Sequence, residues 1–309
     1  MYYLAILFPR LKEVRLPLSR DQLLLLLAAV NLLFLGLDTY LAHLISGTIR
    51  PREWIPVLFG FAAGTLLLIA GLIALRNRLA ATRLVTAVFI ASIAVGLLGA
   101  YFHVVRGTYP TAPVGQRVSI QLLVWAPPVV APLMFALVGL WGISAAWLES
   151  PPDSGRLGLG GGRFLQMPYS KTRAYLFLTS LAILATIISS ALDHARVNYE
   201  NAWLWLPLFV GVFAAIVTFG LALLSQPGRA DMAIYAAAMA LLILVGLLGA
   251  ALHIQADISG QTIVVERFLR EAPFLAPLLF ANMGLLGLIV VLDPAEQVVD
   301  EGSPIPAPA

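Results

Sequence analysis

The chain has 309 residues, of which 60% are hydrophobic and only 11% are charged. Soluble domains carry about 25% charged residues, so a chain this apolar is expected to face lipid rather than water. The absence of cysteine excludes disulfides, thiolate metal sites, iron–sulfur clusters and covalently attached c-type haem. A net charge of +3, spread along the chain, gives no indication of a nucleic-acid partner.

Residues 1–20 are predicted to form an interfacial segment that lies on the membrane surface. The apolar run Tyr2–Phe8 ends at Pro9-Arg10, and no small-residue cleavage pattern follows it, which is unlike a signal peptide. Basic residues then alternate with leucine and valine as far as Arg20. This pattern favours contact with an anionic lipid leaflet.

Eight apolar stretches follow, and each is long enough to cross a bilayer, which takes about 20 residues. Their leucine, alanine, valine and isoleucine content, with little strand-like alternation, favours helices over a β-barrel. The fold is therefore predicted to be an all-α integral membrane protein with eight transmembrane helices. The predicted spans are Leu23–Ile45, Trp54–Leu75, Leu84–Val105, Leu122–Trp147, Ala174–Ala195, Ala202–Leu224, Ala233–Ile254 and Ala272–Leu292.

Two segments outside the spans are predicted to be a cytoplasmic linker and a disordered tail. Residues 149–173, between the fourth and fifth spans, contain Pro151-Pro152 and a glycine-rich run at 158–162. Glycine-rich loops bind phosphate when they follow a strand, but here an apolar span comes first, so a linker is favoured. The Pro/Ala-rich tail, residues 294–309, is predicted to be disordered.

Lysine and arginine are unevenly divided between the two sides of the predicted bundle. Twelve of the 19 lie on the side of the N-terminus and the 149–173 linker, and seven lie on the other side. The positive-inside rule therefore predicts a multi-pass protein of the cell (inner) membrane with both termini in the cytoplasm.

The two halves of the chain repeat one another. Four landmarks recur in the same order, which indicates duplication of a four-helix unit. Because each unit has an even number of spans, the fold is predicted as two tandem parallel four-helix bundle repeats, residues 21–148 and 174–293. The landmarks are Val95–Ala100 with His103 and Val245–Ala250 with His253; Pro128–Ala136 and Pro273–Ala281; Leu37-Asp38 and Leu192-Asp193; and Trp54–Pro56 and Trp205–Pro207.

Polar residues inside the predicted spans are the first candidates for function. Asp38 and Asp193 lie near the outer end of the first helix of each half. An ionisable side chain within a span costs roughly 2.5–3.5 kcal/mol, so each aspartate indicates either a functional site or a structural ion pair. Asn31 and Asn282, in the first and eighth spans, are expected to form a hydrogen bond between helices.

The four histidines of the chain all lie near the outer ends of helices, at His43, His103, His194 and His253. In an up-down bundle the first and third helices are diagonal across the core, so His43 is expected to meet His103, and His194 to meet His253. Such pairs can ligate haem b or a metal such as copper. His103 and His253, together with Asp38 and Asp193, are the predicted metal ligands. Alternatively, the two aspartates would orient the imidazoles.

Glycines and prolines adjoin these histidines. Gly96 and Gly99 share a helix face with His103, a smooth strip that would accept either a flat macrocycle or a closely packed helix. Pro132 removes a helical hydrogen bond from the carbonyl of Pro128, which either frees a polar ligand or marks a later helix start. The second half repeats these residues at Gly246, Gly249, Pro273 and Pro277.

Three functions remain open at this point. A redox or electron-transfer subunit would hold haem b or a metal ion at the outer histidines. A small-solute or ion transporter would line its path with the aspartates and the freed carbonyls. A structural or assembly subunit would need no cofactor and would have the lipid bilayer and other membrane subunits as its partners. No sequence motif names a reaction, so whether the chain is an enzyme stays undecided.

Overall fold

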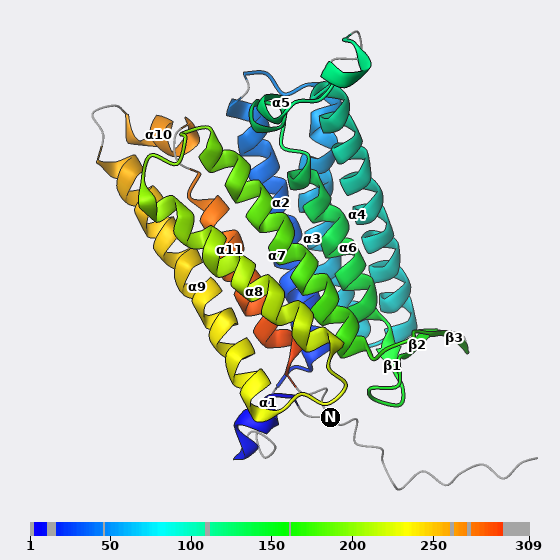
Figure 1. The fold of residues 1–309 in the computed structure, drawn as a ribbon. Helices are drawn as coiled ribbons and strands as arrows, with labels where there is room; N and C mark the ends of the chain where they lie inside the picture. Colours follow the sequence, from blue (N-terminus) through cyan, green and yellow to red (C-terminus); the bar gives the residue numbers. More distant parts are fainter. Residues whose placement is uncertain are drawn as a thin grey trace, which may run out of the picture.

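A computed structural model describes residues 3–10, 17–45, 47–108, 112–160, 162–259, 263–270 and 273–292 (Figure 1). The described chain is predominantly helical, which confirms the all-α class. Its helices are α1 (Tyr3–Leu7), α2 (Arg20–Ile45), α3 (Trp54–Ala74), α4 (Arg78–Arg106), α5 (Ile120–Trp125), α6 (Val130–Ala146), α7 (Lys171–Ala195), α8 (Leu206–Leu223), α9 (Arg229–Ile258), α10 (Val264–Arg270) and α11 (Leu275–Val290). Its strands are β1 (Leu148–Glu149), β2 (Arg156–Gly160) and β3 (Arg163–Gln166).

Six helices among the described residues, α2, α3, α4, α7, α8 and α9, are long and apolar enough to cross a membrane. The chain is therefore a multi-pass membrane protein. The fourth helix of each predicted half is also apolar but shorter, with 17 residues in α6 and 16 in α11.

The predicted fourth span, Leu122–Trp147, is not one continuous helix. Pro127 and Pro128 supply no backbone N–H and force Ala126 into an extended conformation, with φ −74° and ψ 169°, so α5 ends before them. The chain resumes as α6, in which Pro132 lies in the first turn. An N–H at that position would have no partner within the helix, so Pro132 marks a helix start rather than a kink.

The helices form two rings. In the first ring α2, α3, α4 and α6 contact one another in that order and close on themselves, and α7, α8, α9 and α11 do the same in the second. The rings meet where α6 packs against α7 and where α11 packs against α2 (Figure 1). At the second contact, Asn282 Nδ2 donates a hydrogen bond to Asn31 Oδ1 at 2.9 Å, which confirms the predicted interhelical bond.

Glycines set the closest helix contacts within each ring. A Cβ atom added at Gly96 would lie 2.5 Å from the backbone nitrogen of Ala136, and one at Gly99 would lie 2.7 Å from Cβ of Pro132. Only glycine allows α4 to approach α6 this closely. The contact between α9 and α11 is built in the same way from Gly246, Gly249, Pro277 and Ala281.

The two ends of the bundle differ (Figure 1). One end, here called the sheet end, carries α1 and the strands, which pair antiparallel in the order β1-β2-β3 within the segment predicted as a linker. The opposite end, here called the histidine end, carries α5, α10 and the ends of the helices that bear the four histidines.

The N-terminal residues pack partly on the bundle. Helix α1 contacts α9, and Tyr3 and Ala5 are buried. Burial raises the pKa of the Tyr3 phenol above its ordinary value. Residues 11–16 of the predicted interfacial segment and the whole 294–309 tail lie outside the described residues, so these two predictions stay predictions.

Candidate functional site

The histidines predicted to meet do approach one another. The rings of His43 on α2 and His103 on α4 are 6.3 Å apart between centroids and are inclined at 72°. In the second ring, His194 on α7 and His253 on α9 lie close enough to interact electrostatically. Both pairs join the first and third helices of a ring, which are diagonal in the observed order of contacts.

Backbone carbonyl oxygens from outside their own helices orient two of these imidazoles. The Nδ1 atom of His103 lies 2.8 Å from the carbonyl oxygen of Pro128, and that of His253 lies 3.2 Å from the carbonyl oxygen of Pro273. Since a carbonyl oxygen only accepts, each Nδ1 carries the proton, and Nε2 is the acceptor nitrogen of the ring. The carbonyl of Pro128, which Pro132 leaves without a helical partner, is thus bound by His103. The carbonyl of Pro273 is bound by His253 and also accepts from the backbone N–H of Ala276 at 3.0 Å.

The other two histidines make contacts within their own helices. Nδ1 of His43 donates to the carbonyl oxygen of Thr39 at 2.8 Å, one turn back on α2. Nδ1 of His194 lies 3.5 Å from Oγ of Ser190, also one turn back, and His194 also hydrogen-bonds the backbone of Leu204 between α7 and α8. In each pair, therefore, one imidazole contacts a residue one turn back on its own helix, and the other is bound by the segment that precedes the fourth helix of the ring.

The two aspartates interact with one another across the two rings. Asp38 on α2 and Asp193 on α7 are close enough to repel one another electrostatically. Asp193 also pairs with Arg196 at 3.6 Å, and its side chain is 42% exposed. Among the described residues, no three histidine or acidic side chains group closely enough to hold a metal ion. The carbonyls, and not these aspartates, lie against the Nδ1 atoms of His103 and His253.

The glycine strips do not offer a flat surface to a macrocycle. Gly96 and Gly99 face Ala136 and Pro132 of α6, and the second ring fills its strip with Pro277 and Ala281. The strip was predicted to accept either a flat macrocycle or a closely packed helix, and a closely packed helix is what covers it.

Family models, curated proteins and solved structures were compared with this chain, and none matches. What the two rings share is an imidazole held by a carbonyl oxygen, with a second imidazole close to it.

A buried ionic cluster at the sheet end was not predicted. Nζ of Lys171, which is fully buried, donates to Asp21 Oδ2 at 2.6 Å and to the carbonyl oxygen of Trp147 at 2.7 Å. The Tyr175 hydroxyl donates to Asp21 Oδ1 at 3.3 Å, and Arg20 lies over the Tyr175 ring. These contacts join α2 to α7. The feature of the sequence that could have indicated this cluster is the presence of charged residues in the first turn of α2 and of α7.

Proposed function

We propose that this protein is an eight-span membrane protein of two tandem four-helix repeats that binds a transition-metal ion between paired imidazoles. Both termini face the cytoplasm of a cell with an inner membrane, and the histidine end faces outward. Copper is the favoured ion, because imidazole is a good copper ligand and the chain has no thiolate. A copper site of this kind gives the protein an electron-transfer role within a membrane complex.

Matching contacts support the repeat. Gly96 and Gly99 face Ala136 and Pro132 in the first ring, and Gly246 and Gly249 face Ala281 and Pro277 in the second, which supports the proposed repeat. Helix α6 has 17 residues, a length of about 25 Å, which is near the lower limit for crossing a hydrocarbon core of about 30 Å. The segment around α5 adds to this length at the histidine end.

The observation that carries the metal proposal is the geometry of His43 and His103. Their rings are 6.3 Å apart, and both Nδ1 atoms donate to carbonyl oxygens. Histidines that bind metals usually donate their other ring N–H in this way, which fixes the tautomer and the ring orientation. Metal–nitrogen bonds of about 2.0–2.1 Å allow one ion to bind between two rings at this separation. Haem b receives less support, because α6 covers the glycine strip.

If each histidine pair binds one metal ion, the wild-type chain binds two. His103→Ala is expected to remove one of them, because it breaks the pair in the first ring. Metal content would be measured by elemental analysis after equilibrating the purified protein with copper. The control is Gln121→Ala, which changes a polar residue at the same end and should leave the content unchanged. If both variants retain the full metal content of the wild type, the assignment to His103 is wrong.

Absorption spectra of the oxidised and dithionite-reduced protein separate the remaining possibilities. An intense Soret band with sharp reduced bands would assign the histidine pairs to haem b instead. A protein without such bands that also binds no metal would contradict the copper proposal, leaving a transport path or a structural role in a complex.

The span count can be tested by labelling, since the chain has no cysteine of its own. If α6 crosses the membrane, a cysteine introduced by Arg117→Cys should react only from outside intact cells, and one introduced by Arg163→Cys only after permeabilisation. If both positions react from the same side, α6 does not cross and the eight-span proposal fails.

A further inference from the structure

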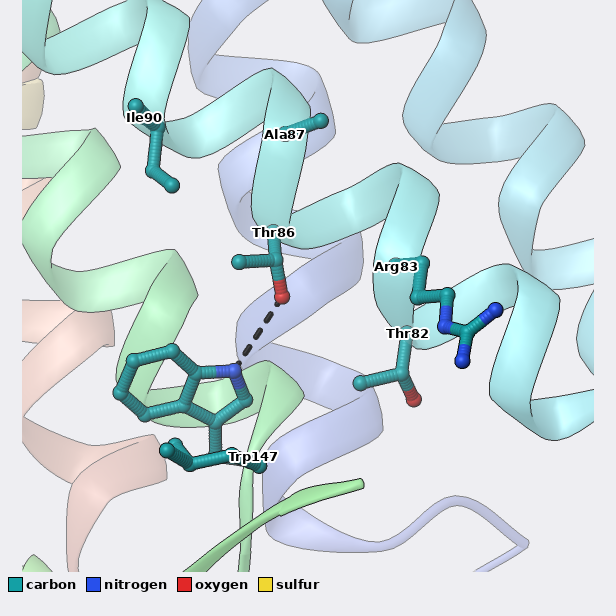
Figure 2. Close-up of a pocket in the computed structure, with 7 residues that line it drawn as sticks. Thr82, Arg83, Thr86, Ala87, Ile90 and Trp147 are labelled. Carbon is teal, nitrogen blue, oxygen red and sulfur yellow. Dashed lines mark hydrogen bonds between the residues drawn. The ribbon is translucent and has the colours of Figure 1, made fainter. Parts of the chain in front are cut away.

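A cavity of about 250 Å³ opens on the side of α4 near the sheet end. Figure 2 shows Arg83 beside Thr82 on α4, with Thr86 and Trp147 pointing toward each other. Trp147 Nε1 donates a hydrogen bond to Thr86 Oγ1 at 3.2 Å. The rest of the lining is apolar, from Ala87, Ile90 and Leu159. The cavity thus combines a cation and two hydroxyls with an apolar wall.

The polar groups of this cavity have hydrogens to donate. Arg83 takes part in none of the ion pairs formed among the described residues. The hydroxyls of Thr65 and Thr179 donate to the carbonyl oxygen one turn back in their own helices. Within the described chain, Thr82 and Thr86 donate no such bond, and Thr86 only accepts from the indole. A guanidinium and two hydroxyls within about one turn of helix are well placed to bind an anion.

An exposed apolar strip leads away from Arg83 along the same face of α4. Ala87, Ile90, Ala94 and Leu97 are all exposed and are spaced three or four residues apart. The strip lies within a candidate membrane span and is roughly 21 Å long from Arg83 to Leu97. Two small residues alternate with two large ones, which leaves shallow recesses that a flexible chain can fill.

We infer that this cavity binds one anionic phospholipid of the leaflet at the sheet end. Its phosphate accepts hydrogen bonds from Arg83, Thr82 and Thr86, and an acyl chain lies along the strip toward Leu97. Tryptophan and arginine are the residues that anchor proteins at the level of lipid headgroups, which matches the position of Trp147. The charge of Arg83 is what selects an anionic over a zwitterionic headgroup.

The second ring lacks these groups. The residues that match Thr82, Arg83 and Thr86 in the repeat are Met232, Ala233 and Ala236, which have neither a positive charge nor a hydroxyl. One tightly bound anionic lipid per chain is therefore expected, rather than two.

Native mass spectrometry of the full chain in detergent, titrated with phosphatidylglycerol or phosphatidylcholine, tests this inference. The wild type should bind one phosphatidylglycerol with preference over phosphatidylcholine. Arg83→Gln should weaken that binding about fivefold, the effect of losing one cation near a membrane surface. The matched control is Arg78→Gln, which removes a charge from the first residue of the same helix but not from the cavity. Because Arg83 is exposed, the substitution should leave the thermal unfolding of the protein unchanged.

Three results would overturn the lipid site. Equal weakening by Arg83→Gln and Arg78→Gln would show that only the overall charge of this end attracts anionic lipid. Equal binding of the two lipids would show that no anion is recognised. Displacement of the bound lipid by inorganic phosphate alone would show that the acyl chain adds nothing and that the site takes a soluble anion.

Discussion

Asp21→Ala is expected to lower the free energy of unfolding by about 3–5 kcal/mol, the usual result of leaving one partner of a buried ion pair behind. Lys171 is fully buried, and its ammonium group donates to Asp21 at 2.6 Å. Without the carboxylate, this charge would stay in a low-dielectric environment beside neutral groups, the carbonyl oxygen of Trp147 and the Tyr175 ring, and next to the cation of Arg20. The loss would be measured as a shift of the unfolding midpoint in mixed detergent and SDS micelles.

Two further variants show whether the loss comes from the stranded charge. Replacing both partners, Asp21→Leu with Lys171→Met, should recover the part of the lost stability that is due to Lys171. The buried Arg20, which also pairs with Asp21 at 3.6 Å, still loses its carboxylate in this variant. Arg106→Ala breaks an ion pair with Glu53 in which the arginine side chain is 49% exposed, so it should cost no more than about 1 kcal/mol. A double variant less stable than Asp21→Ala alone would contradict this explanation.

Gly96→Ala is expected to destabilise the protein by about 1–3 kcal/mol, although alanine is the better helix former. The added Cβ would lie 2.5 Å from the backbone nitrogen of Ala136, so α4 and α6 would have to move apart. The same unfolding measurement applies, and Gly246→Ala should behave alike because it meets Ala281 of α11.

Gly71→Ala is the matched control for this prediction. Nothing lies within 4 Å of a Cβ added at Gly71, which is also in the interior of a membrane helix. The substitution there should be neutral or slightly stabilising, by at most about 1 kcal/mol. Equal effects at Gly96 and Gly71 would mean that close packing of α4 on α6 is not what makes glycine necessary.

Composition and the predicted up-down order of the helices were enough to predict the helical class and the meeting of His43 with His103. The meeting follows from two facts that can be read in a sequence, the spacing of apolar stretches and the alternation of their directions. The bond between Asn31 and Asn282 could be predicted for a similar reason, because a polar side chain inside a span needs a partner on a neighbouring helix.

The later start of α6 and the ionic cluster could not be predicted in the same way. A hydrophobic run shows where lipid-compatible residues lie, but not where the backbone leaves the helix, and Pro127-Pro128 decides that locally. In the sequence alone, Lys171 has the pattern of an ordinary interfacial cation. Its pairing with Asp21 is evident only once the positions of α2 and α7 are known. The role of the glycine strip could not be predicted, because either a cofactor or a helix can pack on a smooth helix face. The sequence alone does not show that α6 packs there.

The ion pair between Lys171 and Asp21 also bears on how the protein is made. The two residues are 150 positions apart, so at about 5–20 residues per second the ribosome delivers Lys171 roughly 8–30 s after Asp21. Over that interval α3, α4 and α6 are synthesised, and Asp21 still lacks the ammonium group of Lys171. Lys171 is the first residue of α7, so its ammonium group can reach Asp21 only once synthesis of α7 has begun. Formation of this ion pair is therefore a late step, and it joins the two rings in the nascent chain.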